Sequence, residues 1–231
     1  MSAMRVPIIS LALAFVSLAS QTGDLVVARD RQDRAALEKI AQDATAAAEK
    51  QTKEAEAQFR AAEAQSYLAE VALELRDKNA ARSAAEAGIR AAERAVALKP
   101  GVAEYHRVLG TLCGQVIPAN VLLGLKYGKC ARGSIERAIE LDPASSKAWL
   151  SRGVGNYYLP ESFGGGVELS MRDFQKAIEL DPKSAEAHLW LGMALRKAQR
   201  NIDARKEFAK SLELNPNRIW AKQQLDKTPA R

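Results

Sequence analysis

The chain has 231 residues, of which 47% are hydrophobic and 27% are charged. This composition is typical of a soluble helical protein and excludes a collagen, a disulfide scaffold and a bundle of membrane helices. The net charge of +6 comes from residues 191–231, which hold ten basic and four acidic side chains. Because aromatic residues are not interleaved with these basic ones, we expect no nucleic-acid partner.

The N-terminal residues have the pattern of a secretory leader. Arg5 precedes an apolar run from Ile8 to Leu18, and the small residues Ser17 and Ala19 have the spacing of a cleavage site. The pattern predicts a signal peptide over residues 1–19, so the mature protein is expected to be periplasmic or secreted, with no integral membrane span. The alternative is an uncleaved anchor, although the apolar run is short for crossing a bilayer.

Residues 20–55 are predicted to form an exposed helical arm or linker. The stretch 41–58 is rich in Ala, Glu, Lys and Gln and contains no Pro, no Gly and no large apolar side chain. Helix propensity there is high, but little is available to pack against another element. Residues 56–100 are amphipathic and predict a first, divergent helical pair.

One short phrase recurs along the rest of the chain. AIELDP occupies 138–143 and again 177–182, SLELNP occupies 211–216, and the more divergent AVALKP ends at Pro100. Each phrase closes an amphipathic helix, because apolar residues recur three and four positions apart and the proline stops the helix. Gly110, Gly153 and Gly192 recur in one register of the helix that follows, which indicates close helix packing.

These periodic units predict an all-α solenoid of helix-turn-helix repeats, about three to four in number, with an N-terminal helical arm and a C-terminal capping helix. The predicted units after the arm and the first pair are a repeat with a long insertion (101–143), a repeat with an LPESFGGG insertion (144–182), a regular repeat (183–216), and a capping helix with a tail (217–231).

The regular unit resembles the tetratricopeptide repeat family. The residues that occupy consensus positions there are His188, Leu191, Gly192, Leu195, Ala204, Phe208, Ser211 and Pro216. In the preceding unit Arg152 departs from the pattern, which has Leu at that position. The resemblance implies stacked helical pairs whose concave face, lined by the first helix of each repeat, binds a protein or peptide.

The register of that family carries the concave face over to particular residues of this chain. The candidate binding residues are Arg107, Lys147, Leu150, Val154, Tyr157, Tyr158, Leu189, Met193, Arg196 and Lys197. Such a face is apolar and aromatic in the middle and bordered by Lys and Arg, which suits an amphipathic peptide or a ligand with an apolar body and an acidic end. The alternative is that these side chains only pack the superhelix.

Two insertions interrupt the repeats. The first lies within residues 116–130 and adds about nine residues to the repeat, and the second, at 159–166, adds about five. Cys113 and Cys130 flank the first insertion on two helices that are expected to be antiparallel. They are expected either to form a disulfide in an oxidising compartment or to remain as two buried thiols.

Each insertion also carries a short resemblance of its own. The run YYLP followed by FGG, at 157–165, resembles the helical T-component of periplasmic TRAP-type transport systems. The run GLKYG, at 124–128 ahead of IERAIELDP, resembles members of the regulator of microtubule dynamics family, which are themselves repeat proteins. The first resemblance implies an exported protein that associates with a substrate-binding partner or an apolar ligand.

The sequence offers little catalytic chemistry. The two histidines, His106 and His188, both occupy the aromatic position of a repeat's first helix and are predicted to be packing residues. Neither a cluster of metal ligands nor a nucleophile elbow is present, so we expect no catalytic residue, metal or cofactor, and not an enzyme. The predicted function is an exported protein-protein interaction scaffold. The alternative is a periplasmic transport accessory or carrier that binds an apolar small molecule.

Overall fold

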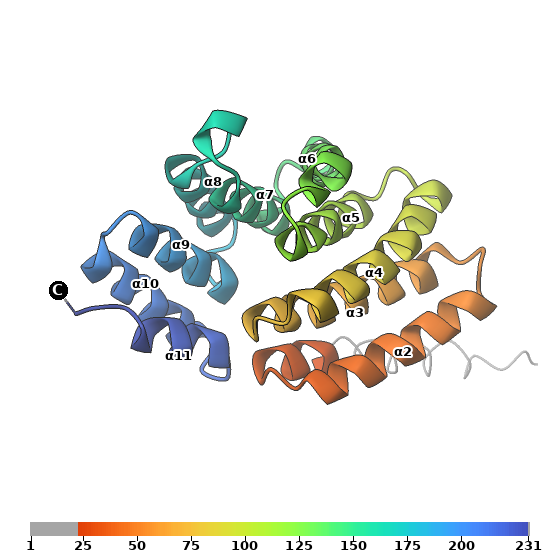
Figure 1. Ribbon diagram of the computed structural model, residues 1–231, viewed down its shortest axis with the longest axis horizontal. Coiled ribbons are helices and arrows are strands. Elements are labelled where there is room, and N and C mark those ends of the chain that lie inside the picture. Colours follow the sequence, from red (N-terminus) through yellow and green to blue (C-terminus); the bar gives the residue numbers. More distant parts are fainter. Residues whose placement is uncertain (1–22, 231) are drawn as a thin grey trace, which may run out of the picture.

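A computed structural model describes residues 23–230 of the chain (Figure 1). The predicted signal peptide at 1–19 lies outside the described residues. Residues 23–30 are helical, and the helices that follow are α2 (Arg34–Lys50), α3 (Ala55–Glu74), α4 (Lys78–Leu98), α5 (Ala103–Val116), α6 (Leu123–Leu141), α7 (Ser146–Tyr158), α8 (Val167–Leu180), α9 (Ala185–Lys197), α10 (Asn201–Leu214) and α11 (Ile219–Asp226), with short 3-10 turns η1 (Ile117–Ala119) and η2 (Glu161–Phe163). This part of the chain is an all-α repeat solenoid, as predicted.

The joints between helical pairs are built alike. Lys99, Asp142, Asp181 and Asn215 each end a helix directly before a proline, and their φ angles are −140°, −142°, −141° and −140°. A proline ring forces this extended conformation on the residue before it. The recurring phrase therefore ends the second helix of each pair, as its pattern predicts.

The recurring glycines let the two helices of a pair approach closely. A Cβ atom added to Gly192 would lie 2.7 Å from the Phe208 ring, and one added to Gly110 would lie 2.7 Å from Ile135. A Cβ on Gly153 would clash with the Phe174 ring in the same way. The close packing that their register indicates is confirmed.

The histidines that the sequence places in the aromatic position contribute to this packing. His106 Nε2 donates to the carbonyl of Pro100 at 2.9 Å, as Trp149 Nε1 does to the carbonyl of Pro143 at 2.9 Å. His188 is buried, and its Nδ1 lies 2.7 Å from a carboxylate oxygen of Glu207 in α10.

The expectation of an exposed arm over residues 20–55 is wrong. Leu37, Ala41 and Ala48 of α2 are buried, and Leu37 packs in one cluster with Leu25 and with Val71 of α3. Helices rich in alanine can approach closely, so this segment packs without the large apolar side chains that the sequence analysis required of it.

The turn before α2 shows that residues 23–50 form a repeat unit of their own. Gln32, Arg76 and Gln199 each follow the first helix of a pair, and all three have a left-handed backbone, with φ of 53°, 66° and 62°. At each turn the amide of the next residue, Asp33, Asp77 or Arg200, donates to a carbonyl five positions back. The described residues thus contain five helical pairs and the cap α11, more than the three to four repeats expected.

The insertions replace this tight turn in the two central pairs. η1 lies between α5 and α6, and η2 lies between α7 and α8. Arg132 of α6 donates from Nη2 to the carbonyl of Phe163 at 3.0 Å, which ties the second insertion to the helix that follows the first. Cys113 and Cys130 are joined in a disulfide that links α5 to α6 across the first insertion.

The two ends of the solenoid meet. Figure 1 shows α11 curving back toward the ends of α2 and α3. Gln223 Nε2 donates to Gln32 Oε1 at 3.0 Å, and Asn215 Nδ2 donates to Asp30 Oδ2 at 2.8 Å. These contacts bridge more than 180 positions of sequence and close the superhelix around its inner wall.

Within residues 23–230, no helix combines the length and the apolar character that crossing a bilayer requires.

Candidate functional site

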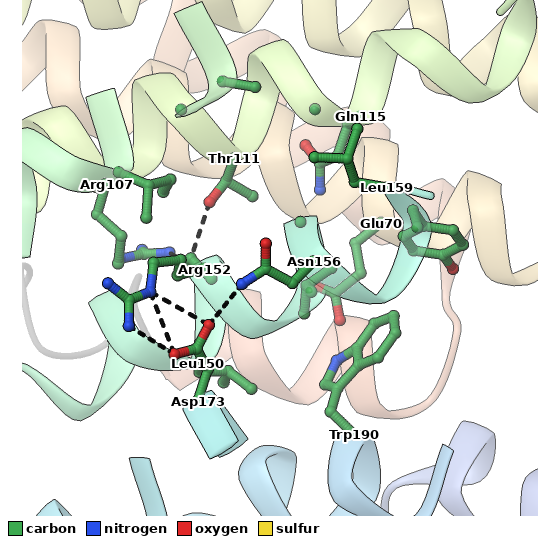
Figure 2. Close-up of a pocket in the computed structure, with 18 of the residues that line it drawn as sticks. Glu70, Arg107, Thr111, Gln115, Leu150, Arg152, Asn156, Leu159, Asp173 and Trp190 are labelled. Carbon is green, nitrogen blue, oxygen red and sulfur yellow. Dashed lines mark hydrogen bonds and ion pairs between the residues drawn. The ribbon is translucent and has the colours of Figure 1, made fainter. Parts of the chain in front are cut away.

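The curve of the solenoid forms a cavity of about 2190 Å³ that is open to solvent. Side chains of α3, α5, α7, α9 and α11 line it, and the cavity extends outward between α6 and α8. Figure 2 shows part of this wall. The first helices of successive pairs thus form the inner wall.

Six of the predicted binding residues line the cavity. They are Arg107, Lys147, Leu150, Val154, Tyr158 and Arg196. Leu150 and Val154 are partly buried against the core, and the Tyr158 side chain is 62% exposed. Together they present an apolar strip on one side of α7.

Leu189 and Met193 are not available for binding, contrary to the prediction. Leu189 is 0% exposed and Met193 is 8% exposed, and both belong to the core that contains Phe174 and Phe208. The reason is that α9 packs against both α8 and α10, so this face of α9 is covered by the helices on either side. Register alone does not reveal how closely those helices approach.

Tyr157 and Lys197 hold each other in place. Lys197 donates from Nζ to the carbonyl of Tyr157 at 2.6 Å and lies 4.4 Å from the centre of its ring. The Tyr157 ring is also in contact with Tyr158 and Trp190, with centroids 5.0 and 5.7 Å away. Both residues therefore support the wall rather than form it.

The cations that border the apolar strip already have partners, which was not expected. Arg107 donates from Nε and Nη2 to the two carboxylate oxygens of Glu104, each at 2.7 Å. Arg196 donates to Gln224 Oε1 at 2.7 Å and to the Thr228 hydroxyl at 3.3 Å. Lys147 remains exposed at 3.9 Å from Glu104. Two of the three cations are therefore already bound to side chains of the chain itself. This weakens the prediction that the ligand has an acidic end, because fewer cations are free to bind it.

A polar network in the middle of the wall was missed by sequence reasoning. Arg152 of α7 donates to both carboxylate oxygens of Asp173, the shortest contact being 2.6 Å, and Asn156 donates to the same carboxylate at 2.8 Å (Figure 2). The signal was present, since Arg152 stands where the repeat pattern has Leu. Because Asp173 is buried, its charge needs these donors.

Aromatic rings gather at one side of the cavity around Trp190. The Trp190 ring lies 5.3 Å from Trp220, 6.1 Å from Tyr158 and 6.2 Å from Phe174, measured between centroids. Trp190, Trp220 and Tyr158 all line the cavity. Sequence reasoning named Tyr158 alone among these three as a binding residue.

A buried ionic cluster joins the two ends of the solenoid where they border the cavity. Arg218 is 0% exposed and forms ion pairs with Glu70 at 2.8 Å, with Glu186 at 2.8 Å and with Glu74. Arg29 lies 2.6 Å from Asp30 and 3.3 Å from Glu186. Four carboxylates thus share two guanidinium groups.

The excess of carboxylates over guanidinium groups affects the pKa values of the cluster. Burial raises the pKa of Glu70 to about 7, although Arg29 and Arg218 act against it. Burial likewise raises the pKa of Glu74. For Glu186, burial is outweighed by Arg218 and Arg29, and the pKa is lowered. Of the three glutamates, Glu186 is therefore the one that the two arginines hold most firmly in its charged form.

Within residues 23–230, no three side chains of His, Cys, Asp or Glu converge in a way that would hold a metal ion.

Comparison with known proteins identifies the class of fold. The profile of the tetratricopeptide repeat matches residues 173–206. A tetratricopeptide protein of Thermus thermophilus, TTC0263, superposes with a TM-score of 0.59 at 18% identity, over 89% of this chain and 98% of that one. PilF of Pseudomonas aeruginosa (TM-score 0.48, 19% identity, 73% and 67% covered) and MamA of Desulfovibrio magneticus RS-1 (0.44, 18%, 80% and 88%) are also similar. The described residues thus have the fold of a tetratricopeptide-repeat solenoid, and residues 173–206 match the repeat itself.

A second profile covers more of the chain. The profile of regulator of microtubule dynamics protein 1-3 matches residues 21–160, which is more than half of the sequence and includes the run GLKYG. The chain belongs to this family. The match begins at the first helical pair, the segment that the sequence analysis took for an arm. A search of curated protein sequences found no match.

Proposed function

We propose that the chain is an exported interaction module that holds a segment of a partner protein against the inner wall of its superhelix. Tetratricopeptide solenoids serve in general as scaffolds for protein binding, and their concave surface is the usual place for it. The observation that carries the proposal is the apolar strip of Leu150, Val154 and Tyr158, which faces the cavity next to the Trp190 ring.

The chemistry of the wall favours a peptide segment with apolar side chains. Its polar groups largely satisfy one another: Arg152 with Asp173, and Ser66 with Gln115 through a hydrogen bond at 3.2 Å. A ligand would therefore gain most by burying apolar surface on the aromatic cluster, at about 25 cal/mol per Å².

The size of the cavity favours a peptide over a small molecule. Sites for small molecules usually enclose about 300–1,000 Å³, whereas this cavity measures about 2190 Å³. A carrier of an apolar small molecule remains the second candidate because the aromatic cluster would suit one. Mass spectrometry of the protein purified under native conditions distinguishes them: a co-purified apolar compound supports the carrier.

Two features support export. The residues of the predicted signal peptide have the charge and apolar run that such leaders need. The disulfide between Cys113 and Cys130 is of a kind that persists mainly in oxidising compartments. Measuring the intact mass of the protein from fractionated cells tests the proposal: a mature chain that lacks residues 1–19 is expected in the exported fraction, and a full-length chain in the cytosol contradicts it.

Site-specific cross-linking tests the binding surface. A photoreactive phenylalanine analogue at Tyr158 should cross-link a partner protein in vivo, because this side chain faces the cavity. The same analogue at Ile202, an exposed side chain of α10, serves as the control. Equal cross-linking at both positions, or none at position 158, would contradict binding at the inner wall.

A further inference from the structure

The most exposed large apolar side chains of the described residues belong to the insertions. Leu125 is 88% exposed, Val121 82%, Phe163 70% and Leu122 66%. The first insertion contributes three of these four, and an uninterrupted repeat has no counterpart to it. Exposed apolar side chains that occur together in this way mark a surface that binds another molecule.

The three aliphatic side chains of the first insertion project from an ordered base. Asn120 accepts from the amide of Leu122 through its side chain at 3.0 Å and from the amide of Leu123 through its carbonyl at 2.9 Å. Leu123 points inward and packs on the core that contains Cys113, which is itself bonded to Cys130. Leu123 is thus packed on the core, whereas Val121, Leu122 and Leu125 are exposed.

Basic residues adjoin these side chains in the sequence, and acidic residues are scarce there. Residues 105–135 contain no Asp or Glu, but they contain Lys126, Lys129 and Arg132 near the insertion. The acids of neighbouring elements are Glu86 of α4, which accepts from Tyr127 at 3.4 Å and is paired with Arg82 at 3.1 Å, Glu136 on the next turn of α6, and Glu161 and Glu168 near the second insertion. The local charge around the aliphatic side chains is therefore positive.

We propose that this insertion surface, defined by Val121, Leu122, Leu125, Lys126 and Lys129, docks on the surface of an anionic lipid bilayer. Val121 and Leu125 are more than four-fifths exposed and Leu122 is 66% exposed, and a bilayer accepts such exposed aliphatic groups without matched shape. Lysines at the level of the headgroups attract anionic lipids by about 1 kcal/mol each. Phe163, whose carbonyl accepts from Arg132 of α6, adds an exposed aromatic side chain on the neighbouring insertion.

Vesicle flotation tests this docking. The full chain is mixed with vesicles of phosphatidylcholine alone or of phosphatidylcholine and phosphatidylglycerol. The expected result is stronger flotation with the anionic vesicles, reduced by salt because the lysines act through screened charge. Replacing Val121, Leu122 and Leu125 together by Ser should weaken binding by at least about tenfold, since full burial of even one aliphatic side chain contributes about that factor.

Two comparisons make the test specific. Ile202→Ser removes an aliphatic side chain of α10 that is 60% exposed and should leave binding unchanged. Hydrogen-deuterium exchange then locates the contact, because anionic vesicles should slow exchange at residues 117–126 irrespective of what the N-terminal residues bind. Equal flotation with both vesicle types, or unchanged exchange at 117–126, overturns the proposal; capture of a protein by this surface in the absence of lipid would replace it.

Discussion

Glu70 shows how burial and charge compete at a single side chain. It accepts from Arg218 at 2.8 Å and lies in the field of Arg29, and yet burial raises its pKa to about 7. The two arginines are shared with Glu74, Glu186 and Asp30, so their charge is divided among four carboxylates. A proton on Glu70 relieves this excess of negative charge.

This predicts a pH dependence of stability. Because the pKa of Glu70 is raised above its ordinary value of 4.5 on folding, the folded chain binds the proton more tightly than the unfolded chain. Its contribution to the free energy of unfolding is present below pH 4.5 and is lost as the pH rises through about 7. Glu70→Gln removes the titration, so the variant should gain stability relative to the native chain across that interval.

Urea denaturation of both proteins at the two ends of the interval measures the difference. A difference that does not change with pH, or one that changes in favour of the native chain as the pH rises, would show that Glu70 is charged throughout.

The helical pair is the unit that the sequence describes well. In the pair of α9 and α10, a glycine faces a phenylalanine, and the proline at the end sets the next joint. Sequence periodicity predicts these features because the contacts lie within one repeat unit. It misses contacts between units, which is why Leu189 was assigned to the inner wall although α8 covers it.

A glycine substitution tests the packing of one pair. Gly192→Ala should lower the free energy of unfolding by about 1–3 kcal/mol, because the new methyl group would overlap the Phe208 ring. Helix propensity acts in the opposite direction by about 1 kcal/mol and offsets part of the loss. Gly114→Ala in α5, where the added Cβ meets nothing within 4 Å, is the matched control and should be stabilising or neutral. Equal effects of the two substitutions would contradict the close approach.

Sequence reasoning failed at the N-terminal segment for a related reason. Residues 41–58 lack large apolar side chains, and the prediction of an arm followed from that. The segment packs through Leu37 and through alanines such as Ala41 and Ala48, whose small side chains give a weak periodic signal. The left-handed turn at Gln32 likewise contains no glycine that would mark it in the sequence. The composition therefore gave no indication of the helical pair formed by residues 23–50.

At the scale of the whole molecule, closure rests on side chains that are distant in sequence. Arg218 lies between α10 and α11, whereas Glu70 and Glu74 lie in α3. Nothing in either segment alone points to the other, because charged residues on a helix are ordinarily solvated. The sequence therefore predicted a curved array and a capping helix but not that the ends meet.

Removing the central cation should open the molecule. Arg218→Gln leaves Glu70, Glu74, Glu186 and Asp30 with Arg29 as the remaining arginine of the cluster, and breaking a buried network in this way costs about 3–5 kcal/mol. We expect a corresponding loss in chemical denaturation and a larger radius of gyration in solution scattering. Arg200→Gln, which removes an exposed pair with Asp203, should cost about 0–1 kcal/mol. A compact Arg218→Gln variant of native stability would refute the role of the cluster.

The meeting of the two ends also limits how this array can change its length. In an open solenoid, a unit can be duplicated or deleted at either end and only its neighbour is affected. Here a sixth pair placed after α10 would carry Arg218 away from α3, and loss of the first pair would remove Asp30 and Gln32, to which Asn215 and Gln223 donate. Within residues 23–230, five pairs is thus the copy number at which the first and last units complete each other, and an evolutionary gain or loss of one unit would require a new closure.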